Sequence, residues 1–194
     1  MLKSIFRPII ILWEKIFERI ANIKLVENSP YGLLRMAVHP YKGQPITLAD
    51  GTRLNTGDHV IELHISNLVL AKGQVGDVKV ANNIRLLPLF REEMHNLAQL
   101  AIHGKLDPRA KVIWGVTMMG PGLRRLGFQL EPMDDNSHSR LLVMWMNFLK
   151  WVFYPSESKT SSKPKSRRKG YQYFMSIEQL MERYGTIEEG YQSL

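Results

Sequence analysis

Apolar residues recur at helical spacing in three long segments of the chain. In residues 8–23 one face carries apolar side chains and the opposite face carries charged and amide side chains. Residues 84–102 show the same period, and residues 140–154 are apolar on nearly every side. We therefore predict an amphipathic N-terminal helix and two longer helices.

Shorter segments with alternating apolar and polar residues predict strands. These segments are residues 33–38, 46–48, 52–54, 58–66, 111–118, 128–131 and 171–175. The Asp50-Gly51 pair predicts a tight turn within a short hairpin, because both residue types tolerate left-handed dihedrals. His39 begins a sequence typical of a turn, and residues 71–81 show no period, so we expect a loop there.

Together these elements predict one α+β domain, in which a small mixed or antiparallel sheet packs with the three helices. A length of 194 residues suits a single domain. We expect residues 1–155 to form the domain body, residues 156–170 a flexible basic loop, and residues 171–194 a strand and a helix that return to the same domain. Ser176 and Gln179 match a capping box at the start of that helix.

The N-terminal helix has two interpretations. Its apolar face comprises Ile9, Leu12, Trp13, Ile16, Phe17, Ile20 and Ile23. We favour packing of this face on the protein core, and the alternative is a helix that lies in a bilayer surface. The same question concerns residues 141–154, whose strongly polar residues are only Asn147 and Lys150. That segment, about 21 Å long, is either deep core or membrane-associated, and it is too short to span a bilayer.

Positive charge is concentrated in one segment. Six basic residues lie within residues 159–169, without an acid: Lys159, Lys163, Lys165, Arg167, Arg168 and Lys169. Removing them from the net charge of +8 leaves only +2. A nucleic-acid interface spreads basic residues over a folded face, so this pattern disfavours nucleic acid. We expect the last five of the six to face an anionic membrane surface instead.

Two absences narrow the cellular context. The sequence has no cysteine, which excludes disulfides and thiolate zinc sites. The apolar run at residues 8–13 is shorter than the core of a signal peptide or a membrane span. We expect a cytoplasmic protein that associates with a membrane only at its surface.

The candidate chemistry is clearest in residues 57–67. Alternation along this strand turns three aliphatic side chains toward the core and places Asp58, Glu62 and His64 on the opposite face. A carboxylate beside a histidine can act as a base with its orienting acid, and with Asp58 the pair could hold a divalent metal. The alternative is a solvent-facing strand whose polar residues have no specific role. The pattern identifies no particular metal or cofactor.

A second candidate is the glycine-rich turn at residues 120–127. Backbone N–H groups there could bind a phosphate, and Arg124 and Arg125 could add charge-assisted hydrogen bonds. The turn has neither the lysine and hydroxyl of a P-loop nor the spacing of a dinucleotide fingerprint. The alternative is a plain turn with two exposed arginines.

Three runs of residues carry a family resemblance: LADGTRLNTGDHVIELHISN (48–67), GVTMMGPGLRRLGFQLEP (115–132) and SIEQLMERYG (176–185). They resemble the bacterial YkoP-like family, whose members occur alone or appended to polysaccharide deacetylase domains. The resemblance implies a cell-envelope context and no particular activity. It also implies that Asp58, Glu62, His64, Asn67 and Arg125 matter beyond folding.

Two classes of function remain open. The first is an accessory or ligand-binding domain of cell-envelope polysaccharide or lipid-linked sugar metabolism, with a phosphorylated or saccharide ligand. The second is a transferase or hydrolase with catalytic Asp58, Glu62 and His64, and with the ligand held by Asn67 and the two arginines. Nucleic-acid binding through the basic loop ranks last, because the loop has no interleaved aromatic residues.

Overall fold

The computed structural model describes residues 2–66, 69, 74–75, 78–79, 83–117, 120–133, 135–153 and 170–186. Several predictions concern residues outside these ranges. These predictions concern Asn67, the expected flexible loop at 156–170 apart from Gly170, and the five basic residues expected at a membrane: Lys163, Lys165, Arg167, Arg168 and Lys169.

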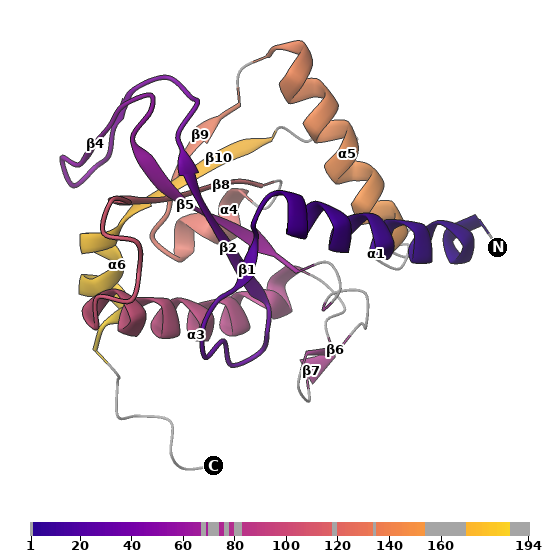
Figure 1. The fold of residues 1–194 in the computed structure, drawn as a ribbon, viewed down its shortest axis with the longest axis horizontal. Coiled ribbons are helices and arrows are strands. Elements are labelled where there is room, and N and C mark those ends of the chain that lie inside the picture. Colours follow the sequence, from indigo (N-terminus) through magenta and orange to yellow (C-terminus); the bar gives the residue numbers. More distant parts are fainter. Residues whose placement is uncertain are drawn as a thin grey trace.

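A six-stranded mixed sheet forms the centre of the domain (Figure 1). Its strands are, in spatial order, β1 (Lys24–Leu25), β2 (Leu34–Pro40), β5 (His59–Ile65), β8 (Val112–Thr117), β10 (Tyr171–Ser176) and β9 (Gln129–Pro132). All neighbours are antiparallel except β5 and β8, which are parallel. Helix α3 (Asn83–Ile102) lies between these two strands in the sequence, as a parallel pair requires. The predicted single α+β domain is confirmed.

One face of the sheet carries the main core. Ile61 and Leu63 of β5 pack there with Phe90, Met94 and Leu97 of α3. The shorter helices α4 (Gly120–Arg125) and α6 (Ile177–Tyr184) contribute to the same cluster. The predicted inward face of the polar strand is therefore correct.

The other helices and ribbons lie around this centre. Helix α1 (Leu2–Ile20) crosses α5 (Ser137–Phe153) at the side of the sheet (Figure 1), and the two pack through Ile10 and Val152. The predicted short hairpin is present as β3 (Ile46–Thr47) and β4 (Arg53–Leu54).

Four details differ from the sequence predictions. Helix α1 begins at Leu2 and contains Pro8, although a proline inside a helix removes one backbone hydrogen bond. The expected loop at 71–81 contains a ribbon of β6 (Gln74–Val75) and β7 (Val78–Lys79). His39 belongs to strand β2 and not to a turn. The capping box is only half formed, since the amide of Gln179 bonds Gly127 instead of reaching back.

The prediction that α1 packs on the core through its apolar stripe is wrong. Ile10, outside that stripe, is 4% exposed, whereas Ile20 within it is 77% exposed. The stripe turns outward because α1 contacts α5, and this neighbour selects a different face of the helix. Helix α5 is not deep core either, since Met144 is 63% exposed. In the part of the chain that is described, no helix is long and apolar enough to cross a membrane.

Strands β5 and β8 separate after a short pairing. Their ladder runs from Val60 and Val112 to Glu62 and Trp114, although both strands continue beyond it. The ring of Tyr173 bridges the opening, and its hydroxyl donates to the carbonyl of Leu63 at 2.7 Å. Burial raises the pKa of this phenol, and the charge of Glu62 adds to the effect, so the hydroxyl remains a donor.

Glycine is required beneath this tyrosine. A Cβ atom at Gly115 would lie 2.3 Å from the hydroxyl oxygen of Tyr173, far closer than atoms can approach. The small residue on β8 therefore allows the aromatic ring to cross the strand and reach β5.

A buried carboxylate fixes the segment that leads into β2. Glu93 of α3 is fully buried and accepts hydrogen bonds from Ser29 Oγ at 2.7 Å, Tyr31 N at 3.2 Å and Leu33 N at 3.0 Å. These donors take the place of water around the buried carboxyl group. The sheet edge is thus held to α3 by a polar anchor inside the core.

We expect Tyr173→Phe to lower the free energy of unfolding by about 1–3 kcal/mol, because the buried Leu63 carbonyl loses its donor. Urea denaturation would measure the change. Tyr171→Phe is the matched control, since Tyr171 lies on the same strand and face and is only partly buried. Equal effects of the two substitutions would contradict a role for the bridge.

Candidate functional site

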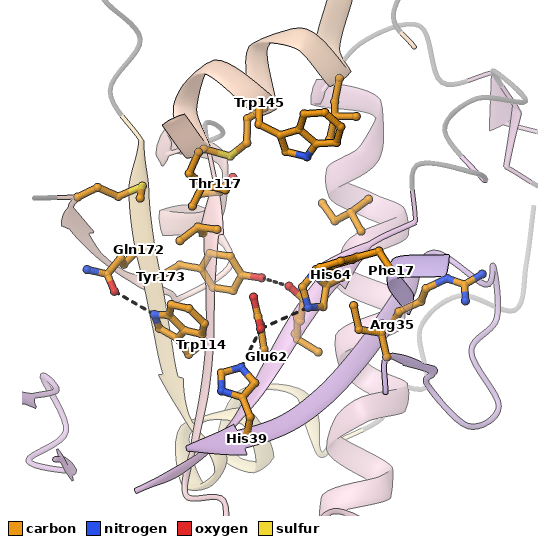
Figure 2. A pocket seen from close by; sticks show the side chains of 18 of the residues that line it. Phe17, Arg35, His39, Glu62, His64, Trp114, Thr117, Trp145, Gln172 and Tyr173 are labelled. Atoms are coloured by element: carbon orange, nitrogen blue, oxygen red, sulfur yellow. Dashed lines mark hydrogen bonds and ion pairs between the residues drawn. The ribbon is translucent and has the colours of Figure 1, made fainter. Parts of the chain in front are cut away.

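A cavity of about 1400 Å³ lies between the sheet and the helices α1 and α5 (Figure 2). Its floor is formed by polar and aromatic side chains of four strands: Arg35, His39, Glu62, His64, Trp114 and Gln172. Its walls are formed by apolar side chains of the two helices: Trp13, Phe17, Leu142, Trp145 and Met146. The cavity therefore combines a polar end with an apolar lining.

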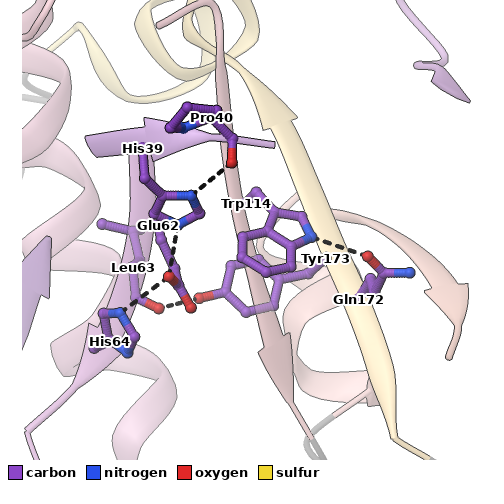
Figure 3. A network of polar contacts seen from close by, with 8 residues as sticks. All are labelled: His39, Pro40, Glu62, Leu63, His64, Trp114, Gln172 and Tyr173. Atoms are coloured by element: carbon purple, nitrogen blue, oxygen red, sulfur yellow. Dashed lines mark hydrogen bonds and ion pairs between the residues drawn. The ribbon is translucent and has the colours of Figure 1, made fainter. Parts of the chain in front are cut away.

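Glu62 is the centre of the floor (Figure 3). Its Oε2 lies 2.7 Å from His39 Nε2 and 3.4 Å from His64 Nε2. The other ring nitrogen of His39 lies 3.0 Å from the carbonyl of Pro40, which can only accept. Both nitrogens of His39 thus face acceptors when Glu62 is ionised. The contacts with Glu62 and Pro40 together fix the orientation of the His39 ring.

The surroundings of Glu62 favour its charged form. Burial alone would raise the pKa of this carboxyl, but the hydrogen bonds and charges of His64 and His39 outweigh burial and lower the pKa below its ordinary value. Glu62 is therefore a carboxylate at neutral pH. Both histidines contact Oε2, so Oε1 is available to accept a hydrogen bond from a ligand.

Two buried nitrogen atoms of the floor lack a well-aligned hydrogen bond. They are Arg35 Nε and His64 Nε2, although the latter lies 3.4 Å from Glu62 Oε2. Arg35 and His64 face each other across β2 and β5. Arg35 also binds Glu18 of α1 through Nη1 at 2.9 Å, which ties the helix to the floor. Unpaired buried donors are costly, and in proteins they commonly mark a place for water or a ligand.

Trp114 and Gln172 form the side of the floor. The indole N–H of Trp114 donates to Gln172 Oε1 at 3.1 Å, which fixes the amide and leaves its N–H groups to donate elsewhere. The ring of His39 meets Trp114 edge-on, with 5.8 Å between the ring centroids. This side of the cavity is therefore a fixed aromatic surface with an amide donor beside it.

Of the predicted site residues, the structure brings together Glu62 and His64. Asp58 is exposed in the turn before β5, where its Oδ2 accepts from the backbone N–H of Asn55 at 2.8 Å. The expectation that Asp58 joins Glu62 and His64 is wrong, because Asp58 lies in the turn before the strand and its carboxylate bonds Asn55. Within the described ranges no three His, Asp or Glu side chains are placed to hold a metal ion.

The two predicted arginines lie elsewhere. Arg124 and Arg125 are exposed at the end of α4 and do not line the cavity. Their neighbours Leu123 and Leu126 pack into the core on the α3 side of the sheet. Helical geometry therefore turns the arginines outward, and they do not converge with Glu62.

Sequence reasoning missed His39 and Arg35. Both come from β2, where Leu34, Met36 and Val38 pack toward α3 and the alternate positions point to the cavity. This alternation was visible, but the following Pro40 suggested a turn. The pairing of β2 with β5, which sets His39 beside Glu62, could not be read from either strand alone.

Comparisons with known proteins agree on one family. The family model described as the YkoP domain matches residues 3–184. The chain is also similar to "Uncharacterized protein YkoP" of Bacillus subtilis (strain 168), with 26% identity over 130 residues, which are 66% of this chain and 71% of the relative. The search of solved structures found no match.

We expect Glu62→Gln to reduce the free energy of unfolding near neutral pH by about 1–3 kcal/mol, through the loss of charge-assisted hydrogen bonds. Because the folded pKa lies below the ordinary 4.5, the contribution is complete above about 4.5 and is lost as the pH falls through the folded value. Urea denaturation of both proteins from neutral to acidic pH should show the difference shrinking. A difference that is constant with pH would contradict the ionised pair.

Proposed function

The chain belongs to the YkoP domain family, and we propose that it is a ligand-binding domain whose cavity takes an amphiphile with a hydroxylated head group. The observation that carries this proposal is the division of one cavity into a polar floor and apolar walls. A ligand that fills it would need polar groups at one end and an apolar chain at the other.

The floor favours hydroxyl groups at the polar end. A hydroxyl can donate to Glu62 Oε1 and also accept from the unpaired groups of His64 or Gln172. An anionic head group would meet the ionised Glu62 at close range, and a cationic one would meet the guanidinium of Arg35. A neutral polyol or saccharide head avoids both conflicts, and Trp114 offers a ring against which it could pack.

The walls favour an apolar chain. Phe17 of α1 and Trp145 of α5 line the cavity (Figure 2), with Leu142 and Met146 beside them. Methionine and aromatic side chains adapt to flexible apolar ligands. A lipid-linked sugar has both required parts, and it is consistent with the cell-envelope context that the family resemblance implies.

The second candidate function is acid–base catalysis in the same cavity. The observation in its favour is that the Glu62 carboxylate contacts the imidazole rings of both His39 and His64, at 2.7 and 3.4 Å. In this alternative His64 acts as the base and Glu62 orients it, as in other histidine–carboxylate pairs. A transferase or hydrolase would use this arrangement without Asp58, Arg124 or Arg125.

Intrinsic fluorescence can test the binding proposal, because Trp13, Trp114 and Trp145 all line the cavity. We expect dodecyl maltoside, below its micelle concentration, to change the emission and to bind more tightly than dodecyl phosphate or dodecyltrimethylammonium. Glu62→Gln should weaken binding of the maltoside by about tenfold or more, since a hydrogen bond to a charged group is worth roughly 1.5–3 kcal/mol.

The matched control is Asp58→Asn, which neutralises a carboxylate four positions earlier but outside the cavity. Its affinity should equal that of the unmodified protein. Equal affinity for the three detergents would refute the proposed head-group site. An equal loss of affinity in Glu62→Gln and Asp58→Asn would also refute it.

A further inference from the structure

The outward face of α1 is a continuous apolar stripe. Leu12 is 61% exposed, Ile9 59% and Ile16 45%, and together with Ile20 they follow one another at intervals of three and four residues. Residues at these intervals are neighbours on a helix. Soluble surfaces seldom carry so many large aliphatic side chains in one row, so this face calls for a partner.

Two cations border the stripe. Lys15 and Arg19 are exposed and lie four positions apart, each three positions after a stripe residue, Leu12 or Ile16. Neither has a salt bridge among the described residues. The acid of this helix whose side chain is described, Glu18, is held by Arg35 on the side of the sheet. Apolar residues with a cationic border are the composition of helices that lie in anionic bilayer surfaces.

The stripe continues into the mouth of the cavity. Trp13 of α1 and Trp145 of α5 line the cavity and are also 51% and 37% exposed. Leu141 and Met144 extend the apolar surface along α5. Tryptophan prefers the boundary between lipid and water, where its ring is partly in each phase. The rim therefore has the chemistry of a membrane interface.

We propose that the outward faces of α1 and α5 dock on an anionic lipid bilayer, with the mouth of the cavity against the lipid. The docking stands on the exposed stripe and its cations. The entry of an amphiphile from the bilayer into the cavity rests in addition on the proposed function. The proposal is argued from α1 and α5, and the basic residues 159–169 lie outside the described residues.

A lipid surface fits this face better than a second copy of the chain. In a symmetric pair of α1 helices, the stripes would meet and Lys15 and Arg19 would approach their own copies. Among the described side chains of α1, Glu18 could offset these positive charges, but it already forms a salt bridge with Arg35. An anionic bilayer provides the opposite charge along the whole border.

Vesicle flotation tests the docking, with phosphatidylcholine vesicles that contain or omit phosphatidylglycerol and no added ligand. We expect the full chain to float more strongly with the anionic lipid. Lys15→Gln/Arg19→Gln should reduce this binding by about 30-fold, because each basic residue at an anionic surface contributes roughly fivefold. Leu12→Gln/Ile16→Gln should reduce binding to both kinds of vesicle by at least about tenfold.

Ile102→Gln is the matched control, since Ile102 is 50% exposed but lies at the end of α3. It should float like the unmodified protein. Circular dichroism must show that each variant is folded. If Leu12→Gln/Ile16→Gln does not fold, flotation of Lys15→Gln/Arg19→Gln and of the single variant Leu12→Gln tests the proposal instead. Flotation that neither variant weakens would overturn the proposal, as would failure of the unmodified chain to float.

Two further outcomes are distinguishable. A dimer in solution that Leu12→Gln/Ile16→Gln dissociates, without flotation of the unmodified chain, would assign the face to a second copy and overturn the proposal. Loss of flotation together with intact binding of dodecyl maltoside would reject docking and leave the proposed function standing. Flotation without binding of dodecyl maltoside would reject the proposed function and leave the docking on a bilayer standing.

Discussion

The early separation of β5 from β8 is the constraint on which the rest of the structure depends. Parallel pairing ends at Glu62 and Trp114, and beyond this point the strands need another way to satisfy their backbone groups. Tyr173 supplies one by crossing Gly115 to reach Leu63. Because the sheet opens at this place, the cavity is lined by Glu62 of the sheet and also by residues of the main core, such as Phe90 of α3.

A partly buried carboxylate can remain ionised in such a cavity only if nearby groups compensate its charge. His39 and His64 provide that compensation for Glu62, and both contact the same oxygen. The arrangement leaves one carboxylate oxygen and several donors directed at the cavity. Unpaired polar groups destabilise a folded core, but they can form hydrogen bonds with a polar ligand. The geometry of the floor therefore supports the proposed binding of a hydroxylated head group.

The two helices beside the cavity show how far an apolar pattern can mislead. The stripe on α1 satisfies every criterion for a core-facing helix, yet its aliphatic residues Ile9, Leu12, Ile16 and Ile20 face outward, and its aromatic residues Trp13 and Phe17 line the cavity. Periodicity identifies which side chains share a face, but a neighbouring element decides whether that face is covered. Here α5 contacts Ile10, outside the stripe, and the cavity occupies the space that the sheet would otherwise fill.

The sequence by itself determined the α+β class, the longer helices and strands, and the inward and outward faces of β5, because these follow from local periodicity and turn chemistry. It also placed Glu62 and His64 on one face of a strand. Only the tertiary structure decided that His39 and Arg35 join them, that Asp58, Arg124 and Arg125 do not, and that α1 turns its apolar stripe outward. The physical reason is that strand register and helix docking depend on contacts between residues far apart in the chain, which no local pattern records.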